Sequence, residues 1–224
     1  MIDFLGYFSA TREFFEAGYG VGRIPADLLA PEIDSQLEQL GSLPKLIKNI
    51  LVNEHDAVVN QGKLAILPSR VTVHDIVEKY VEFVELHYGN KAVEIEHDSG
   101  VTYLASNEIL IRTARALRDY FDILLPYQLL YKFERLQFNT DGGPLRPDII
   151  RSSKFYGLAH LLRMLVKLPA LLRVVACGQA GLMDRIACIH DFVAFVRQNA
   201  PYILDLSVDY KEASPEYVKS VGSS

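Results

Sequence analysis

Several side chains with nucleophilic or metal-binding potential lie in the second half of the chain: His160, Cys177, Cys188 and the pair His190-Asp191. A histidine oriented by a carboxylate can activate a thiol, and Cys188 lies two residues before His190. Residues two apart on a helix point to different sides, however, so this spacing does not bring the thiol to the ring. No cysteine or histidine pair has the spacing of a zinc finger. We expect no catalytic residue, metal or cofactor, and a hydrolase that uses His190 remains a minor alternative.

Gly18, Gly20 and Gly22 imitate a phosphate-binding loop near the start of the chain. No apolar strand precedes these glycines, and Pro25 follows them, so the pattern favours a hinge. The acidic residues fall mostly on expected solvated helix faces or in turns, and no two of them stand out as an acid–base couple. The sequence therefore gives little support to an enzyme.

The composition indicates a folded protein from a reducing compartment. Half of the 224 residues are hydrophobic, 23% are charged, and there are two cysteines, which suits a packed core without a disulfide framework. The net charge of −5 gives no general attraction for phosphate backbones. No apolar run of membrane-spanning length is free of charges, and the N-terminus has no basic lead. We expect a soluble intracellular protein with no membrane partner and no direct nucleic-acid partner.

The elements that must position these residues are mainly α-helical. Apolar residues recur at helical spacing, and the segments 92–97 and 101–105 predict a small β-hairpin around Asp98-Ser99-Gly100. Thr72 is the expected N-cap of the helix over 71–89, and Gly89 is expected to close it. Pro126 should break or kink the longest helix. The expected helices span residues 43–61, 71–89, 106–138, 156–172 and 181–200. A tail at 209–221 follows them, with Tyr210 and Tyr217 as its expected anchors.

The first of these helices has an unusually wide apolar arc. Leu43, Ile47 and Val58 fall on one side, and Leu51, Val52, His55 and Val59 continue onto another. Two interpretations fit this pattern. The helix is either buried on two sides, which periodicity alone favours, or it has one side in the core and one that awaits a partner.

Three motifs are more specific than periodicity. They are Leu129 to Gln137, read as LLYKFERLQ; Tyr156 to Arg163, read as YGLAHLLR; and His190 to Phe192, read as HDF. A closing segment contains Asp209-Tyr210 and Pro215 to Tyr217. In this order they resemble the MRG (MORF4-related) domain of chromatin-modifying complexes, over about residues 43–221.

The resemblance implies a mainly α, MRG-type helical domain with a small β-hairpin, over residues 42–224. It implies a nuclear, non-enzymatic scaffold that recruits subunits of a histone acetyltransferase or deacetylase complex. A hydrophobic groove would bind a partner helix or a Phe-x-Leu-Pro segment. A nucleic-acid-associated chromatin protein is the alternative. Transferred to this chain, the partner-binding residues are Leu43, Leu51, Val52, His55, Tyr156, His160, Arg185 and Ile189.

His55 departs from the family pattern, which usually has tryptophan at this position. At a buried anchor the smaller ring would lose about 1–2 kcal/mol of contact energy. With the resemblance in place, the second side of the first helix becomes the expected docking surface.

The motif LLYKFERLQ is expected to stabilise the fold and not to form the binding site. Its apolar residues are expected in the core and its charged residues at the edge of the core. The core members are Leu129, Leu130, Tyr131 and Phe133, and the edge members are Lys132, Glu134 and Arg135.

Residues 1–41 form a separate, aromatic-rich extension outside the resemblance. Phe4, Phe8 and Phe15 recur at helical spacing, and exposed aromatic side chains in such number are unfavourable in water. We expect residues 1–20 to pack on the domain, within one chain or by self-association, or else to form an arm that faces a partner.

Overall fold

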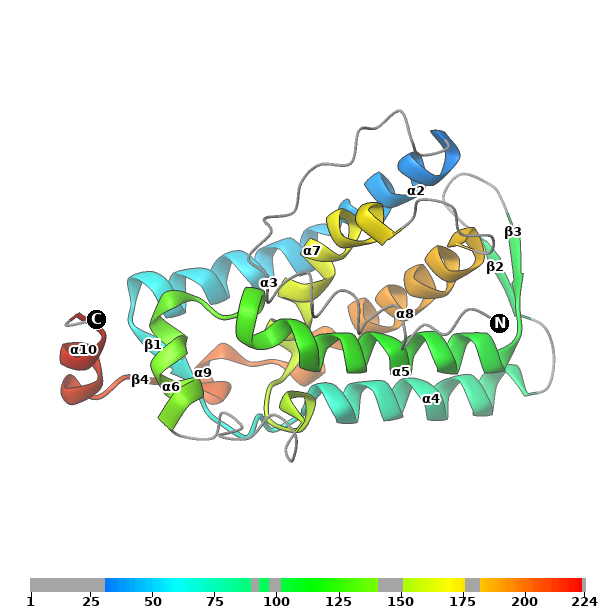
Figure 1. Ribbon diagram of the computed structural model, residues 1–224. Coiled ribbons are helices and arrows are strands. Elements are labelled where there is room, and N and C mark those ends of the chain that lie inside the picture. The colour runs from blue at the N-terminus through cyan, green and yellow to red at the C-terminus, as the bar shows by residue number, and fades with distance from the viewer. Residues whose placement is uncertain (1–30, 90–92, 97–101, 141–150, 176–181, 223–224) are drawn as a thin grey trace. The chain divides into compact units, whose positions relative to one another are not determined.

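The computed structural model describes residues 31–89, 93–96, 102–140, 151–175 and 182–222. The predicted glycine hinge, the hairpin turn, Cys177 and residues 1–20 lie outside these ranges. The chain forms two compact units. The first takes its described residues from Met1–Leu43, Val77–Tyr120 and Leu165–Val196, and the second comprises Pro44–Ile76, Phe121–Met164 and Arg197–Ser224. The fold is mainly α, as predicted (Figure 1).

The elements follow one another in a simple order along the chain. The helices are α2 Pro31–Gly41, α3 Lys45–His55, α4 Val73–Tyr88, α5 Asn107–Leu124, α6 Arg135–Thr140, α7 Leu158–Val175, α8 Leu182–Ile203, α9 Leu206–Asp209 and α10 Pro215–Gly222. The strands are β1 Lys63–Ala65, β2 Val93–Glu96, β3 Thr102–Ala105 and β4 Tyr210–Glu212. Helices α4, α5, α7 and α8 each supply residues to both units.

In the first unit, α4 and α5 run side by side (Figure 1), and Arg118 Nη1 donates to Glu78 Oε1 over 3.0 Å. Tyr80 on α4 lies edge-on against Phe192 of α8, with ring centroids 5.1 Å apart. The predicted hairpin is confirmed, because β2 and β3 pair antiparallel with Val93 opposite Ala105. Asp34 of α2 accepts a hydrogen bond from Arg173 of α7 over 2.8 Å, and Leu37 of α2 is fully buried.

In the second unit, β1 pairs antiparallel with β4, and Leu64 lies opposite Lys211. The sequence pattern did not predict this sheet, because strands of three residues are too short to show a period. Val58, Ala65, Ala159 and Tyr210 form a buried apolar cluster beside it. The sheet thereby anchors the C-terminal tail to the segment that follows α3.

Two local predictions about helix ends are confirmed. The Thr72 hydroxyl accepts a hydrogen bond from the Asp75 backbone, and Asp75 Oδ2 accepts one from the Thr72 backbone over 2.9 Å. This reciprocal pair is a capping box for α4. At the other end, Gly89 takes a positive φ of 55°, a conformation that glycine adopts at little cost when it closes a helix.

The helix expected over residues 106–138 is interrupted near Pro126, as predicted. Helix α5 ends at Leu124, a π-helical turn spans Leu125–Leu129, and Leu130 is extended. Pro126 removes a backbone donor and disrupts the helical ladder, so the chain leaves the helix here. A 3₁₀ turn at Lys132–Glu134 and helix α6 follow.

Candidate functional site

Helix α3 has one buried and one exposed side. Pro44 precedes the helix as its N-cap residue, a position that tolerates the missing backbone donor. Ile47 and Glu54 are buried, whereas Val52 has 65% of its surface exposed and Leu46 has 43%. Leu51 is half-buried and His55 is exposed. The interpretation in which this helix is buried on two sides is therefore wrong, and the use of the exposed side by a partner stays a prediction.

The buried side of α3 is held by an ionic cluster in the second unit. Glu54 on α3 and Glu134, just before α6, both accept hydrogen bonds from Arg163 on α7. Arg163 Nη1 lies 2.6 Å from Glu134 Oε2, and its Nη2 lies 3.0 Å from Glu134 Oε1. Arg163 Nε donates to Glu54 over 3.3 Å, and Nη2 donates to the second Glu54 oxygen. These buried charges are therefore paired with well-directed partners, as burial requires.

His160 and a backbone carbonyl complete the cluster. His160 Nε2 lies 3.1 Å from Glu134 Oε1, and Arg163 Nη1 donates to the Leu129 carbonyl over 2.7 Å. Burial alone would raise the pKa of Glu134, but the charges of His160 and Arg163 and their hydrogen bonds lower it to about 2. Burial disfavours the Arg163 cation, yet Glu134 and Glu54 hold its pKa above the ordinary value. Glu134 and Arg163 are therefore both charged at neutral pH.

Tyr131 joins this cluster to the exposed side of α3. The guanidinium carbon of Arg163 lies 3.8 Å from the centre of the Tyr131 ring, a cation–π distance. The Tyr131 hydroxyl donates to Glu54 over 3.5 Å. The His55 ring meets Tyr131 edge-on, with centroids 5.1 Å apart. His55 thus packs against Tyr131, which Arg163 and Glu54 hold in place.

The C-terminal tail closes the cluster from another direction. The Tyr210 hydroxyl of β4 donates to Glu54 Oε1 over 2.9 Å. The Tyr217 hydroxyl of α10 donates to the Phe133 carbonyl and accepts from the Gln137 backbone. The prediction that Tyr210 and Tyr217 anchor the tail is confirmed. Tyr217 thus attaches to the motif segment, and Tyr210 attaches to Glu54, which shares Arg163 with Glu134.

The expectation that Glu134 lies at the edge of the core is wrong, because its exposed fraction is 1%. Lys132 and Arg135 are exposed, and Leu129 and Leu130 are buried, as predicted. Arg163, on a helix 29 residues further along the chain, supplies the opposite charge that allows Glu134 to be buried. The motif LLYKFERLQ therefore stabilises the fold through the buried ion pair between Glu134 and Arg163.

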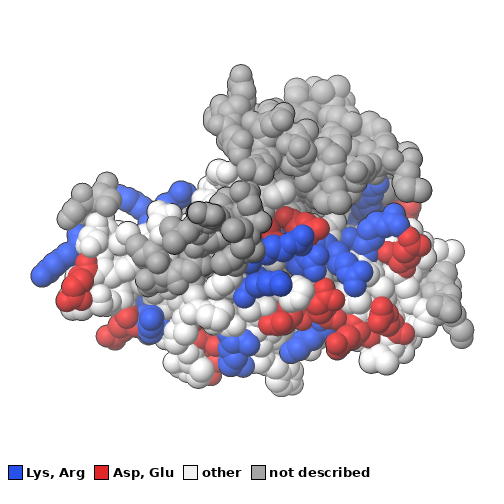
Figure 2. Space-filling model, turned by 60° about the horizontal axis from the view of Figure 1, so that its bottom comes forward, with Lys and Arg blue, Asp and Glu red and all other residues white. Residues whose placement is uncertain are grey.

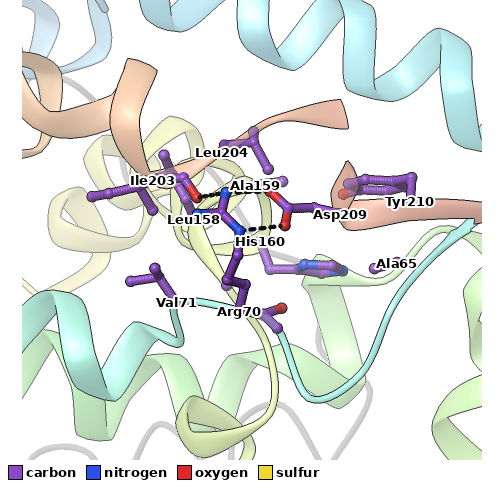
Figure 3. Close-up of a pocket in the computed structure, with 12 residues that line it drawn as sticks. Ala65, Arg70, Val71, Leu158, Ala159, His160, Ile203, Leu204, Asp209 and Tyr210 are labelled. Carbon is purple, nitrogen blue, oxygen red and sulfur yellow. Dashed lines mark hydrogen bonds and ion pairs between the residues drawn. The ribbon is translucent and has the colours of Figure 1, made fainter. Parts of the chain in front are cut away.

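A small cleft lies beside this cluster in the second unit (Figure 3). Arg70 spans one side of it and donates to Asp209 and to the Ile203 carbonyl, each over 3.1 Å. His160 and Tyr210 also line the cleft. Its volume of about 20 Å³ suits a water molecule and is far below that of a ligand site.

The eight residues expected to bind a partner do not share one environment. Leu43, Arg185 and Ile189 belong to the first unit, and the other five to the second. Their exposure also differs: Val52 and His55 are exposed, Leu51 and Arg185 are half-buried, and Leu43, Tyr156, His160 and Ile189 are buried. Tyr156 and His160 meet edge-on at 4.7 Å. The assignment of these eight residues to a partner site stays a prediction.

The sequence pattern did not predict the ionic cluster, although the position of Glu54 indicates a buried acidic residue. Glu54 lies seven residues after Ile47 and four before Val58, which places it on the apolar side of its helix. An acidic residue in that position needs a buried partner. Nothing in the sequence identifies Arg163 as that partner.

Cys188 and Asp191, which were considered for catalysis, lie in surroundings that do not favour it. Burial raises the pKa of the Cys188 thiol to about 11, which disfavours the reactive thiolate. Asp191 accepts from the Tyr80 hydroxyl over 2.6 Å and from Tyr88 over 3.4 Å. Within the described ranges, no three His, Cys, Asp or Glu side chains are grouped so that they could hold a metal ion. Within the same ranges, no helix has the length and apolar character needed to cross a membrane.

The architecture belongs to the mainly α class, with a helix that is fixed on one side and exposed on the other. A family model described as MRG matches residues 31–212, and the chain therefore belongs to the MRG family. The match includes helix α2, which lies before the expected domain boundary at residue 42.

Several relatives are similar over most of this chain. The chain is 32% identical over 198 residues to "Mortality factor related protein 1" of Caenorhabditis elegans, covering 79% of this chain and 58% of the relative. It is 32% identical to the "NuA4 complex subunit EAF3 homolog" of Drosophila melanogaster, covering 80% and 38% respectively. For human "Mortality factor 4-like protein 1" the identity is 30%, with 82% and 46% covered. The matched region thus spans about half the length of these relatives.

Proposed function

We propose that this chain is a non-enzymatic subunit of a nuclear chromatin-modifying complex. Membership in the MRG family supports this proposal, as does the similarity to a protein named as a NuA4 complex subunit. In this proposal the chain binds other protein subunits and holds them together. Whether the host complex is an acetyltransferase or a deacetylase then depends on which subunits it binds.

The proposed docking surface is the exposed side of α3, which comprises Leu51, Val52 and His55. The observation that carries the proposal is the 65% exposure of Val52 on a helix whose other side is fixed by Glu54. A helix fixed in this way presents its outer side without having to rearrange, which reduces the entropic cost of binding. The partner segment is a helix or an extended Phe-x-Leu-Pro segment that covers Val52.

The test is affinity purification of the tagged chain followed by quantitative mass spectrometry. Val52→Lys introduces a charge at the centre of the proposed surface and should remove a specific set of chromatin subunits. Val208→Lys is the matched control, because Val208 is 56% exposed on α9. Circular dichroism should show both variants to be folded. If Val52→Lys recovers the same subunits as the unmodified chain, the proposed surface is wrong.

A further inference from the structure

Two lysines on the exposed side of α3 have no ionic partner among the described residues. Lys45 and Lys48 are both exposed. Several arginines of the described residues are paired with carboxylates: Arg70 with Asp209, Arg118 with Glu78, and Arg173 with Asp34. Figure 2 shows one face of the molecule, on which acidic and basic side chains lie next to each other. Other exposed lysines, such as Lys132 and Lys154, also form no ion pair among the described residues, so it is the position of Lys45 and Lys48 on α3 that distinguishes them.

The two lysines flank the proposed docking residue. At about 100° per residue, Lys48 precedes Val52 by one helical turn and Lys45 precedes it by two, so all three lie within roughly 60° of the helix circumference. Asn49 is exposed beside this arc. The outer side of α3 is therefore a mixed surface, in which an exposed valine is accompanied by two positive charges.

Acidic groups near these lysines are already engaged. Glu54, the acidic residue of α3, is fully buried and paired with Arg163. Asp56, just after α3, accepts hydrogen bonds from Asn60 over 2.6 Å and from Gln61 over 2.7 Å. The exposed side of α3 thus keeps a local positive charge on a chain whose net charge is −5.

We propose that the segment which docks on α3 is acidic, with carboxylates that pair with Lys45 and Lys48 beside an apolar side chain that covers Val52. This inference rests on the proposed function and specifies the partner's chemistry at the same surface. A partner helix would place its carboxylates three or four residues apart, so that both reach the lysine pair. Charges at the rim of an interface act mainly on the association rate and on partner selection.

The test uses the affinity-purified complex and a carbodiimide, which joins lysine amines directly to carboxylates. We expect crosslinks from Lys45 or Lys48 to Asp or Glu residues of a co-purifying subunit. The double variant Lys45→Glu/Lys48→Glu should lower recovery of that subunit about tenfold at low salt and weaken the dependence of recovery on salt. Lys79→Glu/Lys154→Glu is the matched control, since both of these lysines are exposed and belong to other elements than α3.

The outcomes separate this inference from the proposed function. If Val52→Lys removes the subunit while Lys45→Glu/Lys48→Glu retains it and no crosslink forms at either lysine, the acidic partner is wrong and the docking surface stands. If Val52→Lys retains the subunit, both are wrong. If nuclease treatment releases what the lysines hold, the ligand is a nucleic acid and the inference is overturned.

Discussion

Arg163 and Glu134 form a bidentate ion pair in the interior of the second unit, with nitrogen–oxygen distances of 2.6 and 3.0 Å. Because Arg163 also donates to Glu54 on α3, this pair fixes the helix that carries the proposed docking surface. A planar guanidinium suits this task, since it can bind two carboxylates at once. The fold motif and the docking helix are therefore parts of one ionic arrangement.

Substitution of Arg163 tests how much the ionic cluster contributes to the stability of the fold. Arg163→Met leaves two buried carboxylates without their cation, and removal of one partner of a buried pair typically costs about 3–5 kcal/mol. The free energy of unfolding, measured by urea titration, should fall by that amount. Arg112→Met is the control, because Arg112 pairs with Glu108 at the surface and such pairs contribute about 0–1 kcal/mol. Equal urea midpoints for Arg163→Met and the unmodified chain would refute the argument.

The lowered pKa of Glu134 predicts a stability that depends on pH. Its folded value of about 2 lies below the ordinary 4.5, so folding favours the ionised form. This contribution is fully present above pH 4.5 and is lost as the pH falls toward 2. Thermal unfolding between pH 6 and 2 should show a steeper decline for the unmodified chain than for Glu134→Gln, which cannot ionise. Parallel curves for the two proteins would contradict the prediction.

Gly157, the glycine of the YGLAHLLR motif, should not tolerate a side chain. A Cβ there would lie 2.8 Å from the Val71 carbonyl oxygen and 2.9 Å from Ser69, and Gly157 forms a β-bridge with Thr72. Gly157→Ala should therefore cost about 1–3 kcal/mol through steric overlap. Gly222→Ala is the control, because no atom lies within 4 Å of a Cβ at that position. A melting temperature unchanged by Gly157→Ala would show that the backbone yields at little cost.

The aromatic residues of the N-terminal extension predict an effect of truncation. Packing of residues 1–20 on the same chain buries Phe4, Phe8 and Phe15, so their deletion should lower the melting temperature by several degrees. Self-association through this segment would instead make the melting temperature depend on protein concentration. A melting temperature unchanged by the deletion would rule out packing within the chain and favour an arm that faces a partner.

The sequence by itself determined the longer helices and the family. Helical spacing of apolar residues located α3, α4, α7 and α8, and Thr72 and Gly89 marked the two ends of α4, because caps and periodicity are local properties of the chain. The same spacing indicated that α3 has two apolar sides. It could not show which side faces solvent.

Only the tertiary structure decided which charged residues are buried and with which partners they pair. Glu54, Glu134 and Arg163 come from segments far apart in the chain, and nothing in any one segment identifies its partners in the other two. Their burial depends on distant opposite charges that meet only in the folded state, where desolvation is offset by ion pairing and hydrogen bonding. Local patterns specify the direction in which a side chain points, but they do not specify the residue that it meets there.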